Sequence, residues 1–249
     1  MEPWFIGCII FAALCTGVSK AGFSGFSVIS VALLAWAFGV NEGTTVKDSV
    51  GFILPLLIVA DLTVYPAFRK WGNWREVYPL MVTMLIGVGL GYVFLKEIPD
   101  SLARGVIGWI ILAMLMLQLW RRWGNESFLK LAHSRSFGVF AGIAGGVATT
   151  LANAAGPVMQ LFLLSRGFPK MEMVGIGARL FLVINIIKLP LLGNIGLVTA
   201  ESLRMNLIAV PFIWIGIFVG RHYLMKVPQK LFEVLILVFA LIAALRLLF

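Results

Sequence analysis

Apolar residues run in long stretches along the chain, and short polar loops separate them. Six of these stretches are long enough to cross a hydrocarbon core of about 30 Å as helix, at about 1.5 Å per residue. They lie at roughly 51–68, 77–95, 102–120, 174–192, 203–222 and 230–249. We therefore predict six transmembrane helices.

Two further apolar regions, at 5–38 and 137–164, are too long for a single crossing. Each is interrupted near its middle, by GVSKAGFSG at 17–25 and by GGVATTLANAAGP at 145–157. The halves on either side are mostly 10 to 16 residues long, which is short for a span. Each region is therefore predicted to be a hairpin of broken helix, and the pattern leaves open whether it is re-entrant or a pair of short spans.

The two halves of the chain also resemble each other. FAALCTGV at 11–18 returns as FAGIAGGV at 140–147, and IGVGLGYVFLKEIP at 86–99 returns as IGIFVGRHYLMKVP at 215–228, both after a shift of 129. Between them, Asp61 and Pro66 align with Asn185 and Pro190 after a shift of 124. Three spans per half is an odd number, so the halves would cross the bilayer in opposite senses, as in many secondary carriers.

The expected fold class is thus an all-α polytopic membrane protein built as an inverted repeat. The first repeat covers 1–120 with its hairpin at 5–38, and the second covers 137–249 with its hairpin at 137–166. A basic linker at 121–136 joins them. Each repeat consists of one broken-helix hairpin followed by three transmembrane helices.

Composition agrees with this class and excludes a soluble domain. Hydrophobic residues make up 61% of the 249 residues, charged residues make up 12%, and the mean hydropathy is +1.00. The net charge of +9 lies in short loops between apolar runs, which is typical of a topology signal and not of a nucleic-acid interface.

The distribution of basic residues predicts the orientation. If each hairpin begins and ends on one side, twelve Lys and Arg fall on one face and five on the other. The twelve are Arg69, Lys70, Arg75, Arg121, Arg122, Lys130, Arg135, Arg166, Lys170, Arg221, Lys226 and Lys230, and the five are Lys47, Lys96, Arg104, Arg204 and Arg246. The positive-inside rule then places the basic loops in the cytoplasm and both termini outside.

The interrupted segments are the first candidates for a binding site. A backbone break inside lipid is tolerable only where protein, water or substrate satisfies the freed polar groups, and helix ends of this kind can hold an anion. The candidate substrate-binding residues of the breaks are Lys20, Ser24, Thr149, Thr150, Asn153 and Gly156, and Pro157 is suited to the start of a new helix. The alternative is that both breaks are tight turns at the membrane surface.

Polar residues inside the apolar segments are the second group of candidates. Asn185 and Lys188 share a helical face and are expected to bind substrate, whereas Asp61 and Arg179 are candidates for coupling or gating, together with Pro157. Arg179 precedes Lys188 by nine residues, so the two cannot face one cavity on a regular helix. Snorkelling of Arg179 and Lys188, and a structural pairing of Asp61 with a lysine, remain open alternatives.

The sequence offers no group for catalysis or for a cofactor. Cys8 and Cys15 are expected to be free thiols, and His133 and His222 belong to no ligand cluster, so we predict no metal and no cofactor. A membrane enzyme would need a nucleophile–base pair or a metal cluster, and neither is found in the sequence. The expected partners are a small anion and the lipid bilayer, with no nucleic acid, and a homodimer is left open.

Three motifs resemble the TauE/SafE family of bacterial membrane transporters. They are AGFSGFSVIS at 21–30, LANAAGPVMQLFLLSRG at 151–167 and NIIKLP at 185–190, and the resemblance covers essentially the whole chain. It implies location in the bacterial inner membrane and export of sulfite or related organosulfonates, with the family's polar positions falling on Asn153, Gly156, Pro157, Asn185 and Lys188. The chain departs from the family pattern in lacking a long glycine run in the first half.

The main hypothesis is therefore an alternating-access exporter of small sulfur oxyanions, with the anion held between the hairpin tips. The alternative is a proton- or cation-coupled carrier of another small solute that depends on Asp61. The sequence does not distinguish sulfite from sulfonate or sulfate, nor uniport from proton coupling.

Overall fold

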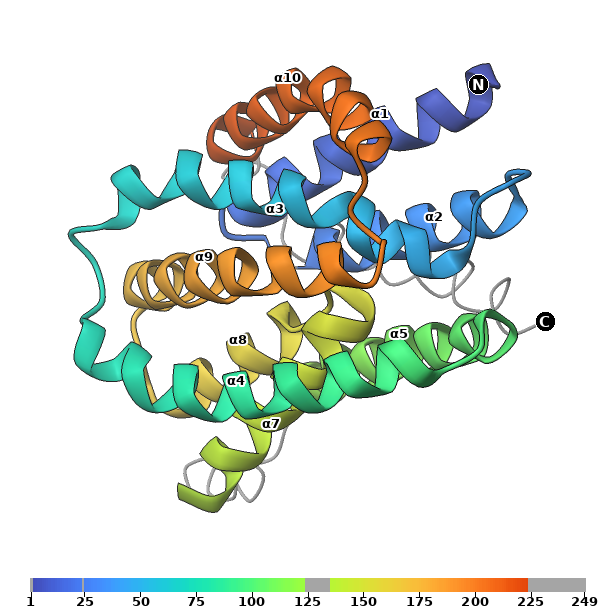
Figure 1. Cartoon of the computed structure of the whole chain (residues 1–249). Helices are drawn as coiled ribbons and strands as arrows, with labels where there is room; N and C mark the ends of the chain where they lie inside the picture. Colours follow the sequence, from blue (N-terminus) through green and yellow to red (C-terminus); the bar gives the residue numbers. More distant parts are fainter. Residues whose placement is uncertain (1, 24, 124–134, 224–249) are drawn as a thin grey trace.

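The computed structural model describes residues 2–23, 25–123 and 135–223, and within these ranges all regular structure is helical. The helices follow one another along the chain as α1 (Pro3–Lys20), α2 (Gly25–Val40), α3 (Val46–Phe68), α4 (Trp74–Glu97), α5 (Asp100–Trp123), α7 (Arg135–Ala152), α8 (Gly156–Ser165), α9 (Lys170–Asn194) and α10 (Ala200–Tyr223). Figure 1 shows them as a bundle in which α3 and α9 lie between α1 and α10 on one side and α4 and α7 on the other.

Five of the helices in the described part of the chain are long and apolar enough to cross a membrane: α1, α3, α4, α9 and α10. The all-helical membrane fold is therefore confirmed. Five of the six predicted spans fall within α3, α4, α5, α9 and α10, and the sixth, at 230–249, lies outside the described residues. Most of the predicted linker lies outside them as well.

Local sequence signals set where several helices begin. Thr45 and Asp48 form a reciprocal capping box at the start of α3, in which each side chain accepts from the other residue's backbone N–H. At the start of α4, the Asn73 side chain accepts from the Arg75 backbone N–H. These polar N-caps therefore fix where the helices begin, just before the apolar runs.

Each predicted hairpin region contains two helices separated by a short non-helical segment. The first pair, α1 and α2, has 18 and 16 residues, and the second pair, α7 and α8, has 18 and 10. The first helix of each pair is therefore somewhat longer than the sequence pattern suggested. At about 1.5 Å per residue, α8 spans about 15 Å, which is half of a hydrocarbon core.

Close helix crossings join the two halves of the chain, and they repeat under the sequence shift. Gly17 of α1 lies so close to the Ile213 carbonyl of α10 that a Cβ would overlap it, and Gly146 of α7 lies equally close to the Met84 carbonyl of α4. Adding 129 to Gly17 and Met84 gives Gly146 and Ile213. The reciprocal contacts, Gly216 with the Leu14 carbonyl and Gly87 with the Ile143 carbonyl, obey the same shift.

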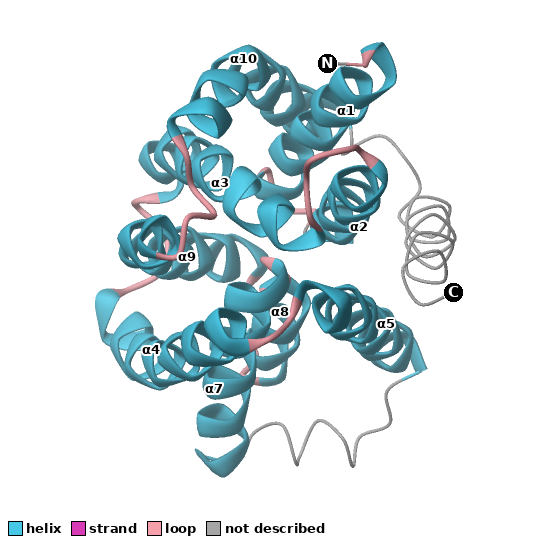
Figure 2. Ribbon diagram, turned by 45° about the vertical axis from the view of Figure 1, so that its right-hand side comes forward, coloured by secondary structure: helices cyan, strands magenta, loops and turns pink. Residues whose placement is uncertain are grey.

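The two crossings lie at opposite sides of the bundle (Figure 2), with α1 and α10 at one side and α4 and α7 at the other. Each hairpin therefore packs against a helix from the other half of the chain. Glycine at each crossing lets the backbones approach closely enough for dispersion contacts, which drive helix association in lipid.

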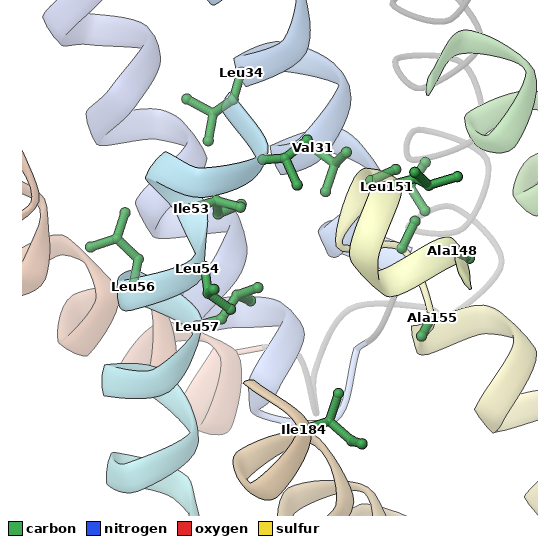
Figure 3. Close-up of a cluster of buried hydrophobic side chains, with 14 of the residues drawn as sticks. Val31, Leu34, Ile53, Leu54, Leu56, Leu57, Ala148, Leu151, Ala155 and Ile184 are labelled. Carbon is green, nitrogen blue, oxygen red and sulfur yellow. The ribbon is translucent and has the colours of Figure 1, made fainter. Parts of the chain in front are cut away.

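Apolar side chains from α2, α3, α7, α8 and α9 fill the middle of the bundle. Figure 3 shows Leu54 and Leu57 of α3 near Ile184 of α9, with Ala148 and Leu151 of α7 close to them. These residues are almost fully buried. The end of α7 therefore lies in the protein interior, surrounded by side chains, and not in a loop open to solvent.

Candidate functional site

Polar side chains from both breaks meet in the middle of this apolar bundle. We call this group the polar core: Lys20 at the end of α1, Asp61 on α3, Thr149 and Asn153 at the end of α7, and Asn185 and Lys188 on α9. All except Lys20 are buried. Polar groups in such surroundings are costly unless they pair with each other, so their partners determine what the cluster can do.

Asp61 connects the first break to the second half of the chain. One carboxylate oxygen accepts from the Lys20 ammonium at 2.6 Å, and the other accepts from the Asn185 amide nitrogen at 2.8 Å. Asp61 is 1% exposed, whereas the Lys20 side chain is 16% exposed. Of the two partners in this ion pair, only Lys20 is partly accessible from outside the polar core.

Lys188 binds the second break. Its ammonium donates to the Thr149 carbonyl at 2.6 Å, to the Thr149 hydroxyl at 3.2 Å and to the Asn153 side-chain oxygen at 2.7 Å. Three acceptors match the three donors of a protonated amine. The carbonyl belongs to the last turn of α7, where the helix dipole is negative and stabilises a cation.

Asn153 has the backbone geometry that ends α7. Its φ of 49° lies in the left-handed region, which asparagine tolerates better than most residues. Its side chain accepts from Lys188 and donates from Nδ2 to the Val50 carbonyl of α3 at 2.9 Å. A single residue thus terminates a helix and fixes that helix end to both α3 and α9.

The two hydrogen-bonded groups form one cluster because α9 joins them. Asn185 contacts Asp61 and Lys188 contacts the α7 end, and the two residues lie three apart on one helical face. The cluster contains two lysine amines and one carboxyl group, and in their ionised forms these leave one positive charge without an ionic partner among the described residues. A buried excess of positive charge is suited to binding an anion.

The structure places the other predicted break residues differently. The Thr150 hydroxyl donates to the Gly146 carbonyl at 2.9 Å, so its hydrogen bond lies within α7 and does not reach the polar core. Gly156 and Pro157 are the first two residues of α8. Ser24 lies outside the described residues, so the structure does not place it.

Arg179 does not belong to the polar core. Its guanidinium donates to the Arg69 and Trp71 carbonyls in the turn between α3 and α4, and to the Gly175 carbonyl at 2.8 Å. It also lies over the Tyr65 ring, 5.8 Å from the centroid. The separation of Arg179 from Lys188 agrees with their being out of phase on α9.

The sequence analysis missed two partners of the cluster. The Lys20 ammonium lies 5.0 Å from the centroid of the Phe181 ring on α9, a cation–π contact. Phe181, Asn185 and Lys188 follow helical spacing of four and three residues, which is the signal that could have identified the phenylalanine. The Val50 carbonyl that binds Asn153 carries no such signal, because any residue supplies a carbonyl.

Comparison with known proteins agrees with these observations. Neither the curated proteins nor the solved structures contain a match to the chain. A family model described as sulfite exporter TauE/SafE matches residues 9–247. This range includes both breaks, the polar core, four of the five candidate spans in full and the greater part of the span in α1. The chain therefore belongs to the TauE/SafE family of sulfite exporters, which are membrane transporters.

Proposed function

We propose that this protein exports sulfite or related small sulfur oxyanions and organosulfonates from the cytoplasm by alternating access, with the anion bound at the polar core. The observation that carries the proposal is a cluster of two lysines and one aspartate where both breaks meet α3 and α9. The family supplies the substrate class, and the charge of the cluster agrees with it in sign. The proposed substrate-binding residues are Lys20, Asn153, Asn185 and Lys188, with Thr149.

The polar groups of the core bind one another in this state, so an anion has to replace some of these contacts. Lys20 is the most exposed of them and would meet the anion first. Movement of the anion outward also gains about 2.3 kcal/mol per charge for each 100 mV of a negative-inside potential. Export therefore needs no second driving ion.

An inverted repeat would provide the two alternating states. The glycine crossings that recur after a shift of 129, and the Asp61–Asn185 hydrogen bond between positions that align after a shift of 124, support such a repeat. The repeats would be 1–120 and 137–249. The glycine crossings and the Asp61–Asn185 hydrogen bond each join a residue of one repeat to a residue of the other. We further propose that the basic loops face the cytoplasm of a bacterial inner membrane and that both termini face outward.

Sulfite flux from proteoliposomes tests the proposal. Lys188→Gln and Lys20→Gln should each lower the flux by about tenfold or more, because each removes the positive charge that holds the anion. Lys96→Gln is the matched control, since it removes a lysine charge from an exposed position at the end of α4. Flux that survives both core substitutions would show that the binding site is elsewhere.

The second candidate function is proton- or cation-coupled transport that depends on Asp61. One observation favours it: a fully buried carboxylate contacts groups from both halves of the chain. In that case Asp61→Asn should abolish the response of flux to an imposed pH gradient. Unchanged coupling in this variant would exclude Asp61 as the proton carrier.

A further inference from the structure

The charges that line the polar core determine more than the sign of its ligand. Ionisable groups in the core come from three helices: Lys20 from α1, Asp61 from α3 and Lys188 from α9. The remaining partners are neutral, namely Thr149, Asn153 and Asn185. The only carboxylate in the described cluster therefore offsets one of its two ammonium groups.

Burial makes this charge balance selective. Lys188 is 0% exposed and Asp61 is 1% exposed, so water screens neither of them well. In such surroundings an uncompensated charge is strongly unfavourable, whereas the attraction between opposite charges offsets part of the cost of burying them. A ligand with one negative charge neutralises the core, and a ligand with two leaves it negative.

A hydrogen-bond acceptor without a partner points in the same direction. Asn185 must direct its amide nitrogen at the Asp61 carboxylate, because the carboxylate can only accept. Its Oδ1 atom is then buried with no donor within reach among the described residues. A ligand that carries an O–H group could donate a hydrogen bond to this oxygen, whereas a fully deprotonated oxyanion has only acceptor oxygens and would leave it without a donor.

We propose that the polar core selects a singly charged oxyanion, such as hydrogensulfite, over a doubly charged one, and that Asp61 sets this preference. The inference rests on the proposed export function and specifies the form of its substrate. Sulfite and hydrogensulfite interconvert near neutral pH, so the protein would move the protonated form. Each transported sulfur atom would carry one negative charge across the membrane.

The first test measures charge per sulfur in wild-type proteoliposomes. The reversal potential of labelled sulfite flux at a fixed concentration gradient gives this ratio, and we expect one charge per sulfur. As competitors of this flux, methanesulfonate, which is singly charged but has no O–H group, should be at least about tenfold stronger than sulfate. A ratio of two charges, or sulfate competing as well as methanesulfonate, would overturn the proposal.

The second test changes the charge of the core. Asp61→Asn leaves two positive charges, so sulfate should gain about tenfold or more as a competitor relative to methanesulfonate. The double variant Lys20→Gln with Asp61→Asn restores the wild-type excess of one charge without an ion pair, and should again prefer methanesulfonate. Glu97→Gln, at an exposed position near the end of α4, is the control for loss of an acid.

These outcomes separate this inference from the proposed function. Absence of flux for sulfite in the wild-type protein contradicts the export function itself. Flux that is present, but keeps its preference in Asp61→Asn, contradicts only the charge-matching inference. If Asp61→Asn does not fold, the double variant also removes the Lys20 ammonium that Asp61→Asn leaves unpaired, and the wild-type competition between methanesulfonate and sulfate still decides the outcome.

Discussion

Lys188 has a structural role in the fold as well as its proposed role in binding the anion. Its ammonium is fully buried and donates to the Thr149 carbonyl and hydroxyl in the last turn of α7 and to the Asn153 side-chain oxygen. An arriving anion would compete with these three oxygen atoms for the N–H groups of Lys188. Binding of the anion would therefore loosen the contact between α9 and the end of α7, which is the kind of change that alternating access requires.

Asn153 allows backbone and side-chain effects to be separated. Asn153→Gly keeps the left-handed backbone conformation without strain but loses the hydrogen bonds to Lys188 and Val50, and should lower stability by about 1–3 kcal/mol. Asn153→Ala loses the same bonds and adds about 1 kcal/mol of backbone strain. We expect thermal unfolding midpoints in one detergent to fall in the order wild type, Gly, Ala.

An alanine variant as stable as the glycine variant would contradict the role of the left-handed conformation. Glycine and wild type with equal midpoints would instead show that the two side-chain hydrogen bonds contribute little. Gly167→Ala is a useful comparison, because Gly167 also has a positive φ, of 73°, but has no heavy atom within 4 Å of the Cβ position. It should show the strain alone.

At the scale of single residues, the sequence was informative about polar residues within apolar helices, because burying a polar group costs free energy. Asp61, Asn185 and Lys188 stand out because charged and amide groups rarely lie within apolar helices without a partner. Which groups would pair was not predictable, because pairing depends on how distant helices pack. The Val50 carbonyl and the Phe181 ring therefore became visible only in the structure.

At the scale of helices, Arg179 fixes the turn between α3 and α4 to the beginning of α9. Arg179→Lys should hold the Arg69, Trp71 and Gly175 carbonyls less well, because lysine donates from a single nitrogen whereas the guanidinium places two nitrogens against separate carbonyls. We expect amide hydrogen exchange in the segment 69–73 to become about tenfold faster, with little change at the centre of α3. Unchanged exchange would show that packing alone holds the turn. Arg75→Lys, an exposed arginine at the same end of the bundle, is the control.

The glycine crossings give a prediction about paired helices. A Cβ at Gly146 would overlap the Met84 carbonyl, and a Cβ at Gly17 would overlap the Ile213 carbonyl. Gly146→Ala and Gly17→Ala should therefore destabilise the protein by similar amounts, about 2 kcal/mol or more, as judged by thermal unfolding in detergent. Gly89→Ala, which has no atom within 4 Å of the Cβ position, should be neutral or slightly stabilising.

Helix positions were largely predictable, because apolar run length reports directly on the thickness of the bilayer. Capping residues refined the ends, as Thr45 and Asn73 show. Helix α7 ran further than expected, since Thr149 and Thr150 are polar but continue the helix while Asn153 ends it. Hydropathy alone does not report where backbone hydrogen bonding stops.

At the scale of the whole molecule, the packing of each half against helices of the other half explains why the polar core lies at the centre of the bundle. Each hairpin packs on a helix of the other half, so both breaks are drawn toward the α3 and α9 pair in the middle (Figure 1). Asp61 and Asn185, which the sequence shift equates, then meet at this axis. The repeated motifs suggested two similar halves, but contact between the matched residues depends on their packing.

The same architecture makes the proposed orientation testable from outside the cell. The turn between α3 and α4 carries Arg69 and Lys70, whereas the turn between α2 and α3 carries Glu42 and lies at the other end of α3. In a background without Cys8 and Cys15, Lys70→Cys should react with a membrane-impermeant maleimide only in inside-out vesicles, and Glu42→Cys only in intact spheroplasts. Both positions are exposed in the structure, so a missing reaction reports the side of the membrane and not burial. The reverse pattern would place the basic loops outside, against the positive-inside rule, and would contradict the proposed orientation of the protein in the membrane.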